Sequence, residues 1–129
     1  MTTNRAIRAA ITDPLRDITG LHVYDYPVDN VQVPAAVLYD LEHTVATFND
    51  GRTTTAEVVV LVSHNDTAQM ARLDDLLDMD DAGSVVSALE DVTNADGVSL
   101  SVRSIGTFGL RVIADTPYYG ATVSLQVWT

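Results

Sequence analysis

The run from Tyr39 to His64 constrains the fold of this chain more than any other segment. Two β-favouring arms are joined by Asn49-Asp50-Gly51-Arg52, and the return arm ends in the apolar run Val58-Val59-Val60-Leu61-Val62. Asp-Gly between such arms favours a hairpin with a type I′ turn, because both central residues of that turn need positive φ. The arms are polar near the turn and apolar at the far end. We therefore expect a hairpin that starts in the core and whose tip reaches a neighbouring copy of the chain.

Length and composition indicate one globular domain spanning residues 1–129. The chain has 129 residues, of which 47% are hydrophobic, so it can bury a core without covalent cross-links. It has no cysteine, which excludes disulfides, thiolate metal sites and a cysteine nucleophile. No apolar run approaches the ~18 residues of a membrane span, and the N-terminus lacks a signal-peptide pattern. We expect a soluble protein made in the cytoplasm, without membrane contact.

The charge of the chain argues against nucleic-acid binding. The formal net charge is −11, with seven arginines scattered along the sequence and no lysine. Binding to a phosphate backbone needs clustered positive side chains. The acidity is expected to keep the protein soluble and to leave it without affinity for DNA.

The N-terminal segment is expected to form a helix over residues 3–18, because apolar residues recur there at helical spacing. These residues are Ile7, Ile11, Leu15 and Ile18. Pro14 interrupts the pattern, since an interior proline removes a hydrogen bond and clashes with the preceding turn. Either the helix kinks, or it restarts with Asp13 as N-cap and Pro14 as first residue. Gly20 suits the position just after the helix end.

The middle of the chain predicts two short strands and two helices. Strands are expected at 21–26 and 35–40, the second running on into the hairpin. A helix follows from 67 to about 78 behind the N-cap cluster Asn65-Asp66-Thr67. Ser84 is expected to cap a further short helix that ends near Leu89.

Two strands are expected to finish the chain, at 98–114 and 118–128. The last one alternates between apolar and small or polar residues, as a half-buried antiparallel strand does. The predicted order is αβββααββ. The predicted class is α+β, with an antiparallel-dominated sheet, long hairpins and helices packed on one face.

The acidic stretch from Asp74 to Asp81 is the nearest approach to a metal site. If Asp78 is position 1 of an EF-hand loop, Asp80 and Gly83 fall at positions 3 and 6. Ala82 and Leu89 then occupy positions that need ligands. The stretch is therefore interpreted as a solvated helix end, and no metal is expected.

The chain shows no assembled catalytic set. His22, His43 and His64 are far apart and lack metal-binding spacing, and no serine lies in a nucleophile elbow. Gly106-Thr107-Phe108-Gly109 lacks the Lys-Ser/Thr of a phosphate loop and is interpreted as a bulge or bend. We expect no enzymatic activity and no cofactor.

The pair Tyr118-Tyr119 follows the turn sequence Asp115-Thr116-Pro117. Strand alternation places one ring inward and one outward. The pair is either a core tyrosine with a surface tyrosine, or an aromatic anchor at a subunit contact.

With the elements in this order, the chain resembles the tail terminators of long non-contractile-tailed bacteriophages. The resemblance covers nearly the whole chain and has no catalytic signature. It rests on Ala6-Ile7-Arg8-Ala9-Ala10, Val23-Tyr24-Asp25-Tyr26-Pro27, Val33-Pro34-Ala35-Ala36-Val37, Asp50-Gly51, Leu73-Asp74-Asp75-Leu76-Leu77, Ser84-Val85-Val86-Ser87-Ala88-Leu89 and Tyr118-Tyr119-Gly120.

The resemblance implies a virion protein that forms a ring, a hexamer in that family, on the end of the tail tube. Such a ring stops tube polymerisation and offers a surface to the neck or head-completion protein, while DNA passes through without specific binding. It is assembled in the host cytoplasm and stays at the neck-proximal end of the tail. The alternatives are another head-to-tail connector or minor tail protein of related fold, or a stand-alone protein-binding module.

The expected contacts of such a ring are at the hairpin tip, at arginines that can pair with carboxylates across subunits, and at the tyrosine pair. These residues are Phe48, Asn49, Asp50, Gly51, Arg52, Thr53, Arg103, Arg111, Tyr118 and Tyr119.

Overall fold

The computed structural model describes residues 4–18, 20–28, 31–45, 52–78, 84–89, 92–93, 98–106 and 108–128, with the backbone alone at 44–45, 52–53 and 92–93. Its elements are, in chain order, α1 (Asn4–Arg16), β1 (His22–Tyr24), β2 (Ala35–Val45), β3 (Arg52–Val62), α2 (Thr67–Leu76), α3 (Val85–Leu89), β4 (Val92–Thr93), β5 (Ser99–Ile105), β6 (Gly109–Ile113) and β7 (Thr116–Trp128). The class is α+β, as predicted.

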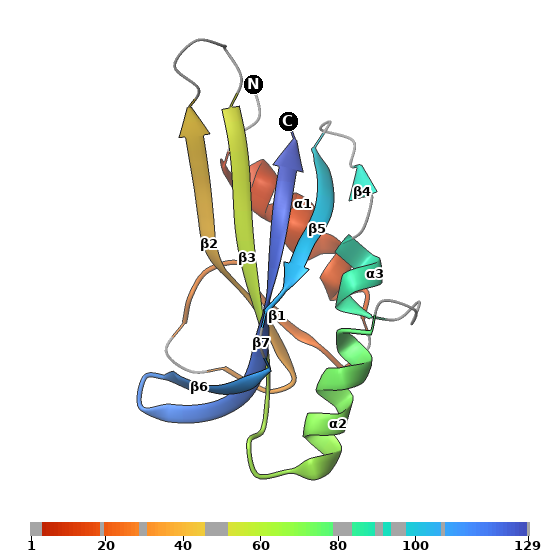
Figure 1. Ribbon diagram of the computed structural model, residues 1–129, viewed down its shortest axis with the longest axis vertical. Coiled ribbons are helices and arrows are strands. Elements are labelled where there is room, and N and C mark those ends of the chain that lie inside the picture. The colour runs from red at the N-terminus through yellow and green to blue at the C-terminus, as the bar shows by residue number, and fades with distance from the viewer. Residues whose placement is uncertain are drawn as a thin grey trace.

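The sheet is mixed and mostly antiparallel. Its strand order is β1-β2-β3-β7-β5-β4, and β6 pairs with the first part of β7 (Figure 1). Among the strands that the structure describes, only the short β1–β2 pairing is parallel. The chain returns after α3 to place β7 against β3, with Thr54 opposite Val127 and Val62 opposite Tyr119. The two long strands β3 and β7 therefore form the centre of the sheet.

The helices pack on one face of the sheet, which we call the covered face. Figure 1 shows α1 crossing behind β7 and β5, with α2 and α3 beside it. One apolar cluster joins all three helices to the inward rows of β2, β3, β5 and β7. Its fully buried members include Ile11, Leu15, Leu73, Leu76, Leu89, Leu38, Val58, Val60, Leu100, Val123 and Leu125. The predicted apolar stripe of the N-terminal helix and the predicted alternation of the last strand are confirmed by this burial.

Helix α1 runs through Pro14 without restarting. The proline lies close to the C-terminal end of the helix, so few residues beyond it depend on the turn that it disturbs. Gly20 has a positive φ of 79°, but it lies beyond two further turns and not directly after the helix end. The prediction of its place at the helix end is therefore wrong, although Gly20 does adopt a left-handed conformation, which favours glycine.

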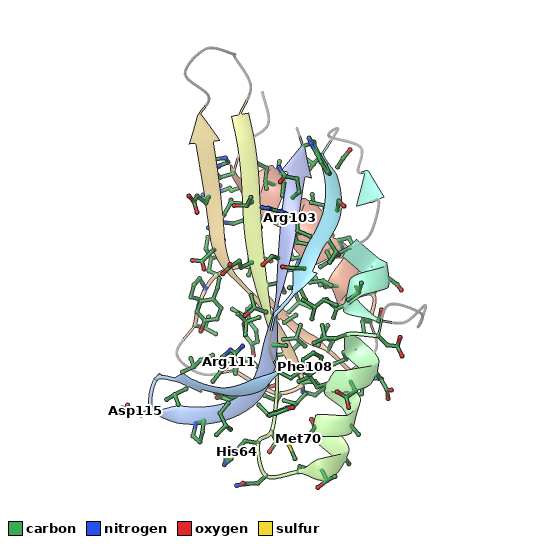
Figure 2. All side chains as sticks on the ribbon, viewed as in Figure 1. His64, Met70, Arg103, Phe108, Arg111 and Asp115 are labelled. Atoms are coloured by element: carbon green, nitrogen blue, oxygen red, sulfur yellow. The ribbon has the colours of Figure 1, made fainter. Side chains whose placement is uncertain are left out.

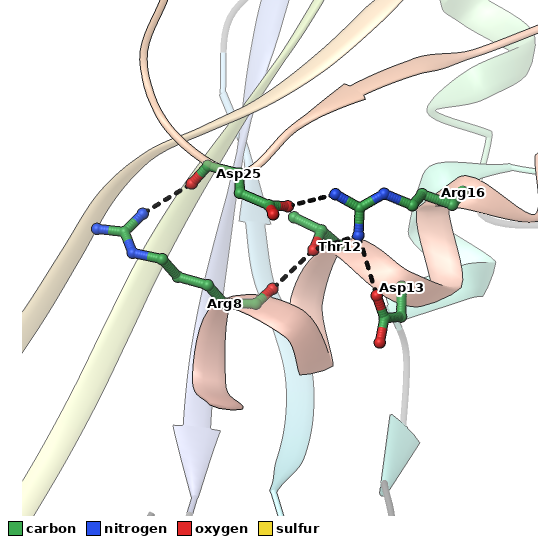
Figure 3. Close-up of polar contacts among 5 residues, drawn as sticks. All are labelled: Arg8, Thr12, Asp13, Arg16 and Asp25. Atoms are coloured by element: carbon green, nitrogen blue, oxygen red, sulfur yellow. Dashed lines mark hydrogen bonds and ion pairs between the residues drawn. The ribbon is translucent and has the colours of Figure 1, made fainter. Parts of the chain in front are cut away.

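Polar contacts fix α1 to the segment that follows β1 (Figure 3). Arg8 donates through Nη1 to the backbone oxygen of Asp25 at 2.8 Å, and its guanidinium lies over the ring of Tyr26, 4.4 Å from the centroid. Arg16 pairs with Asp25 at 2.6 Å and with Asp13 at 3.0 Å. The β1 edge of the sheet is thereby held to the helix layer.

Both predicted caps are present. Asp66 Oδ1 accepts hydrogen bonds from the backbone N–H groups of Ala68 at 3.0 Å and Gln69 at 3.3 Å, at the start of α2. Ser84 Oγ accepts from the N–H of Ser87 at 3.0 Å, at the start of α3. These bonds satisfy donors that have no partner within the helix.

The predicted strand 98–114 is divided into two. β5 ends at Ile105 and β6 begins at Gly109, although the N–H of Gly106 still donates to Thr122 O at 2.6 Å. The bend interpreted from the two glycines is confirmed. The short β4 was not predicted, so the described elements follow the order αβββααββββ, and the predicted ending in two strands is wrong.

The turn before β7 comes earlier than predicted. Ala114 and Asp115 both have positive φ, of 48° and 68°, and Ile113 pairs with Thr116. This is the pattern of a two-residue type I′ turn. β7 therefore begins at Thr116 and includes Pro117. Asp115 marks the tip of this β6–β7 hairpin, which curls away from the rest of the sheet (Figure 2).

The register of β2 and β3 also departs from the sequence-based expectation. A two-residue turn at Asp50-Gly51 would pair Asn49 with Arg52, whereas Arg52 pairs with Val45. The register predicted from that turn is wrong, and the turn residues themselves lie outside the described part of the chain. A bulge at Tyr39 then shifts the pairing by one residue, so that Asp40 lies opposite Glu57.

Candidate functional site

Apart from Trp128, which is 53% exposed, the other face of the sheet is polar over the half that holds the C-terminal end of β7. Side chains there alternate with the buried row of the covered face and are partly or fully exposed. Cross-strand pairing sets them side by side, with Thr55 next to Gln126 and Gln126 next to Ser101. We call this surface the open face, made of Thr55, Glu57, Thr122, Ser124, Gln126, Ser101 and Ser104.

An acidic hollow lies at the β2 margin of the open face. It has a volume of about 170 Å³ and is lined by Asp40, Leu41, Glu42, Thr55, Ala56 and Glu57. Asp40 lies directly opposite Glu57 because of the bulge at Tyr39, and Glu42 follows two residues further along β2. Like charges directly opposite each other destabilise an antiparallel pair. The hollow therefore concentrates three carboxyl groups at a cost in folding free energy.

The pKa of Glu57 is raised above its ordinary value of 4.5, first because its carboxyl group shares a hydrogen bond with the Asp40 side chain. Partial burial and the negative charges of Asp40 and Glu42 raise it further. A carboxyl–carboxyl hydrogen bond needs one proton on the pair, so the protonated form is favoured. A positive group in the hollow would remove this repulsion.

Sequence reasoning missed the acidic hollow. Asp40, Glu42 and Glu57 carry no motif, and their meeting depends on the β2–β3 register and on the bulge. The predicted turn register would have placed Glu57 opposite Thr44, away from the two other acids.

Arg103 lies at the opposite margin of the open face, on β5. The pairing skips this residue, since Val102 faces Leu125 and Ser104 faces Ser124. Its side chain is exposed, and within the described residues it makes no ion pair. Figure 2 places Arg103 over the sheet near β5 and β7, well separated from Arg111 at the base of the β6–β7 hairpin. The structure does not bring these two predicted contact residues together.

Arg111 borders a second hollow, between the β6–β7 hairpin and the edge of β2. This hollow has a volume of about 250 Å³ and is lined by Tyr39, Asp40, Val59, Arg111, Val112 and Ile113. Arg111 Nη1 donates to the backbone oxygen of Leu110 at 3.3 Å. On the outer side of the hairpin, Leu110 is 65% exposed and Val112 is 69% exposed. The alternation around Arg111 could have signalled this apolar row, but sequence reasoning treated the segment as ordinary strand.

Tyr118 and Tyr119 pack on opposite faces of the sheet. Tyr118 is only 7% exposed and belongs to a small cluster with Val37 and Leu61 on the face away from the helices. Tyr119 packs, partly buried, against the main core. Both rings thus have contacts within the protomer, and little of Tyr118 is available to a partner.

The remaining predicted contact residues belong to the hairpin tip. Phe48, Asn49, Asp50 and Gly51 lie outside the residues that the structure describes. Arg52 and Thr53 are on β3, where they pair with Val45 and Thr44, but their side chains are not described.

The candidate metal ligands are not brought together among the described residues, where no group of three His, Cys, Asp or Glu side chains could hold an ion. His43 links elements instead, with Nδ1 2.9 Å from Thr54 Oγ1 and Nε2 2.8 Å from Asn4 Oδ1. Asp80, Ala82 and Gly83, at which the acidic stretch was compared with an EF-hand loop and interpreted as a solvated helix end, fall in the part of the chain that the structure leaves undescribed.

Comparison with known proteins gives no family. No protein-family model matches the chain, and no curated protein matches it significantly. Within the described ranges, no helix is long and apolar enough to cross a membrane. What the chain does must therefore be argued from its own surfaces.

Proposed function

We propose that this protein is a structural component of a phage virion, which forms a ring on the end of the tail tube. The ring ends tube polymerisation and provides the surface to which the neck or head joins. The protein has no catalytic turnover in this role. It acts through contacts with its own copies, with the tube protein and with a neck or head-completion protein.

The observation that carries the proposal is the division of the sheet into a covered face and an open face. The helices and the apolar rows account for the stability of one face. The open face is polar, partly solvent-exposed and flanked by charged groups of opposite sign. A surface of this kind suits contacts between proteins, since charged groups there set register and orientation.

The chain-wide sequence resemblance to tail terminators supports the same proposal. The α+β class agrees with the class of fold that the resemblance implies, and α2 and α3 begin at the expected caps. In this proposal the hairpin tip at 48–53 contacts the next subunit of the ring.

The proposal is tested by mass and by function. The purified protein should form a closed oligomer in light scattering, and it should stop the growth of tubes when mixed with the tail-tube protein of its phage, as seen by negative-stain microscopy. Removal of its gene should give tails of uncontrolled length that do not join heads. Tails of normal length in its absence would overturn the proposal.

A further inference from the structure

We propose that Arg103 of one copy of this chain enters the acidic hollow of a second copy, so that the β5 margin of one sheet meets the β2 margin of the next. The inference rests on the proposed function, because it supplies the head-to-tail contact from which a ring closes.

The acidic hollow contains three carboxyl groups and, among the described residues, no basic partner for them. Asp40, Glu42 and Glu57 are exposed and line one recess on the same side of the β2–β3 pair. Asp40 lies directly opposite Glu57, and the negative charges of Asp40 and Glu42 both act on Glu57. Among the described residues, none of the three makes an ion pair with a basic side chain. A planar guanidinium, with five N–H donors, could bond two carboxylates at once.

The edge of β2 beside the hollow is accessible. β1 pairs with β2 only from Ala35 to Val37, and no described strand continues that pairing beyond Val37. A second copy can therefore approach the hollow from the side of the sheet as well as from its open face.

The β5 margin supplies the complementary charge. β4 pairs with β5 only at Ser99 and Leu100, so the rest of β5 has no outer strand partner in the described ranges. Arg103 stands at the bulge of this edge and is the sole charged residue in β5. The bulge frees it from the regular ladder, so its long side chain can extend toward a neighbour.

The two margins point to a second copy as the occupant. They lie at opposite sides of one sheet, with β3 and β7 between them. A contact between unlike margins leaves one of each unused on every dimer, and it repeats until the assembly closes. It also offsets the repulsion expected when chains of net charge −11 assemble.

The test is a charge swap measured by sedimentation velocity over a range of protein concentrations. Arg103→Glu and Glu42→Arg should each weaken assembly by about 30-fold or more, as for the loss of one partner of a hydrogen-bonded charge pair. The double variant Arg103→Glu/Glu42→Arg should restore assembly, because the pair is rebuilt with its signs exchanged. A mixture of the two single variants should also assemble.

Matched controls distinguish the loss of the contact between Arg103 and Glu42 from the effect of a change in net charge. Arg5→Glu on α1 and Asp74→Arg on α2 make the same changes in net charge at exposed positions outside both margins. They should leave assembly within about 3-fold of the wild type, and circular dichroism should show that every variant is folded.

The outcomes distinguish this inference from the proposed function. A wild-type ring that survives both single substitutions overturns the Arg103 contact and leaves the ring itself standing. A double variant that does not recover also overturns the contact. An assembly that stops at two protomers overturns the head-to-tail arrangement, and a wild type that stays monomeric at every concentration overturns the proposed function as well.

Discussion

The covered and open faces belong to the same strands but have opposite roles. On β7, Val123 and Leu125 are completely buried under the helices, whereas their neighbours Ser124 and Gln126 point to the polar side and remain partly exposed. On β3, Val58 is buried and Glu57 is exposed. Successive residues of a strand point to opposite faces, so one strand can serve two environments.

This difference separates the face that stabilises the fold from a face that contributes little to its stability. Burial of apolar area contributes roughly 25 cal/mol per Å², and the fully buried apolar residues of β7 beyond Gly120 all lie on the covered face. The open face gives little folding free energy, and at the acidic hollow it even opposes folding through like charges. A face that costs stability in the single chain is a natural place for a contact between chains.

The largest difference between the covered and open faces is expected when two neighbouring residues of β7 are replaced by alanine. Leu125→Ala should lower the free energy of unfolding by about 2–5 kcal/mol, because it opens a cavity in a completely buried site. Gln126→Ala should lower it by less than about 1 kcal/mol, since it removes only a long hydrogen bond of 3.4 Å to Thr54 O. Urea unfolding measures both. Similar losses at the two positions would break the distinction between the faces.

A smaller effect is expected where β7 passes closest to β3. A Cβ atom at Gly120 would lie 2.5 Å from Val60 O and 2.8 Å from Leu61 Cδ2, so Gly120→Ala forces the backbones apart. We expect a loss of about 1–3 kcal/mol. Gly109→Ala is the matched control, because the paired Gly109 has only Arg111 Nη1 nearby, at 3.6 Å. Its effect should stay within about 0.5 kcal/mol in the same urea experiment. Equal effects would show that the approach of β7 to β3 is not tight.

The sequence predicted the covered face far better than the open face. The stripe of α1, the caps Asp66 and Ser84, and the alternation of the last strand all depend on local spacing, which the sequence displays. The acidic hollow depends instead on the pairing of two strands. The Asp50-Gly51 signal favoured a register four residues away from the observed one along β2.

Alternation could not correct that error. Between Asp40 and Val45 a shift by four residues keeps every side chain of β2 on the same face, so alternation there does not distinguish the two registers. The bulge at Tyr39, which brings Asp40 opposite Glu57, has no local signature either. The turn before β7 was predicted too late in the sequence, at Asp115-Thr116-Pro117. Its first central residue is Ala114, and alanine does not favour the positive φ that the tight β6–β7 pairing imposes on it.

The attachment of the helix layer can be weakened without touching the sheet. Asp66→Ala removes the acceptor for two N–H groups at the start of α2, so it should lower the free energy of unfolding by about 1 kcal/mol. Asp66→Asn retains a capping oxygen and should recover most of this loss. Thermal unfolding of both variants provides the measurement. Because the change leaves the open face intact, assembly of the folded Asp66→Ala protein should equal that of the wild type, and a loss of assembly would link the two faces.

The smallest expected effect is a pH dependence confined to the acidic hollow. The pKa of Glu57 is raised in the folded chain above 4.5, so the folded state holds more protons than the unfolded state just above that pH. Ionisation of Glu57 therefore lowers the free energy of unfolding as pH rises from 4.5 through the raised pKa of the folded chain. Above that pKa the whole loss of stability remains. Glu57→Gln removes the ionisable group while keeping its size. At concentrations where the chain is monomeric, the variant should melt at a higher temperature than the wild type above the window, and the difference should shrink toward zero below about pH 4.5.

Asp74→Asn on α2 controls for the loss of one negative charge. A Glu57→Gln difference that stays constant across this range would show that Asp40 and Glu57 do not repel each other, and the open face would then carry no electrostatic cost.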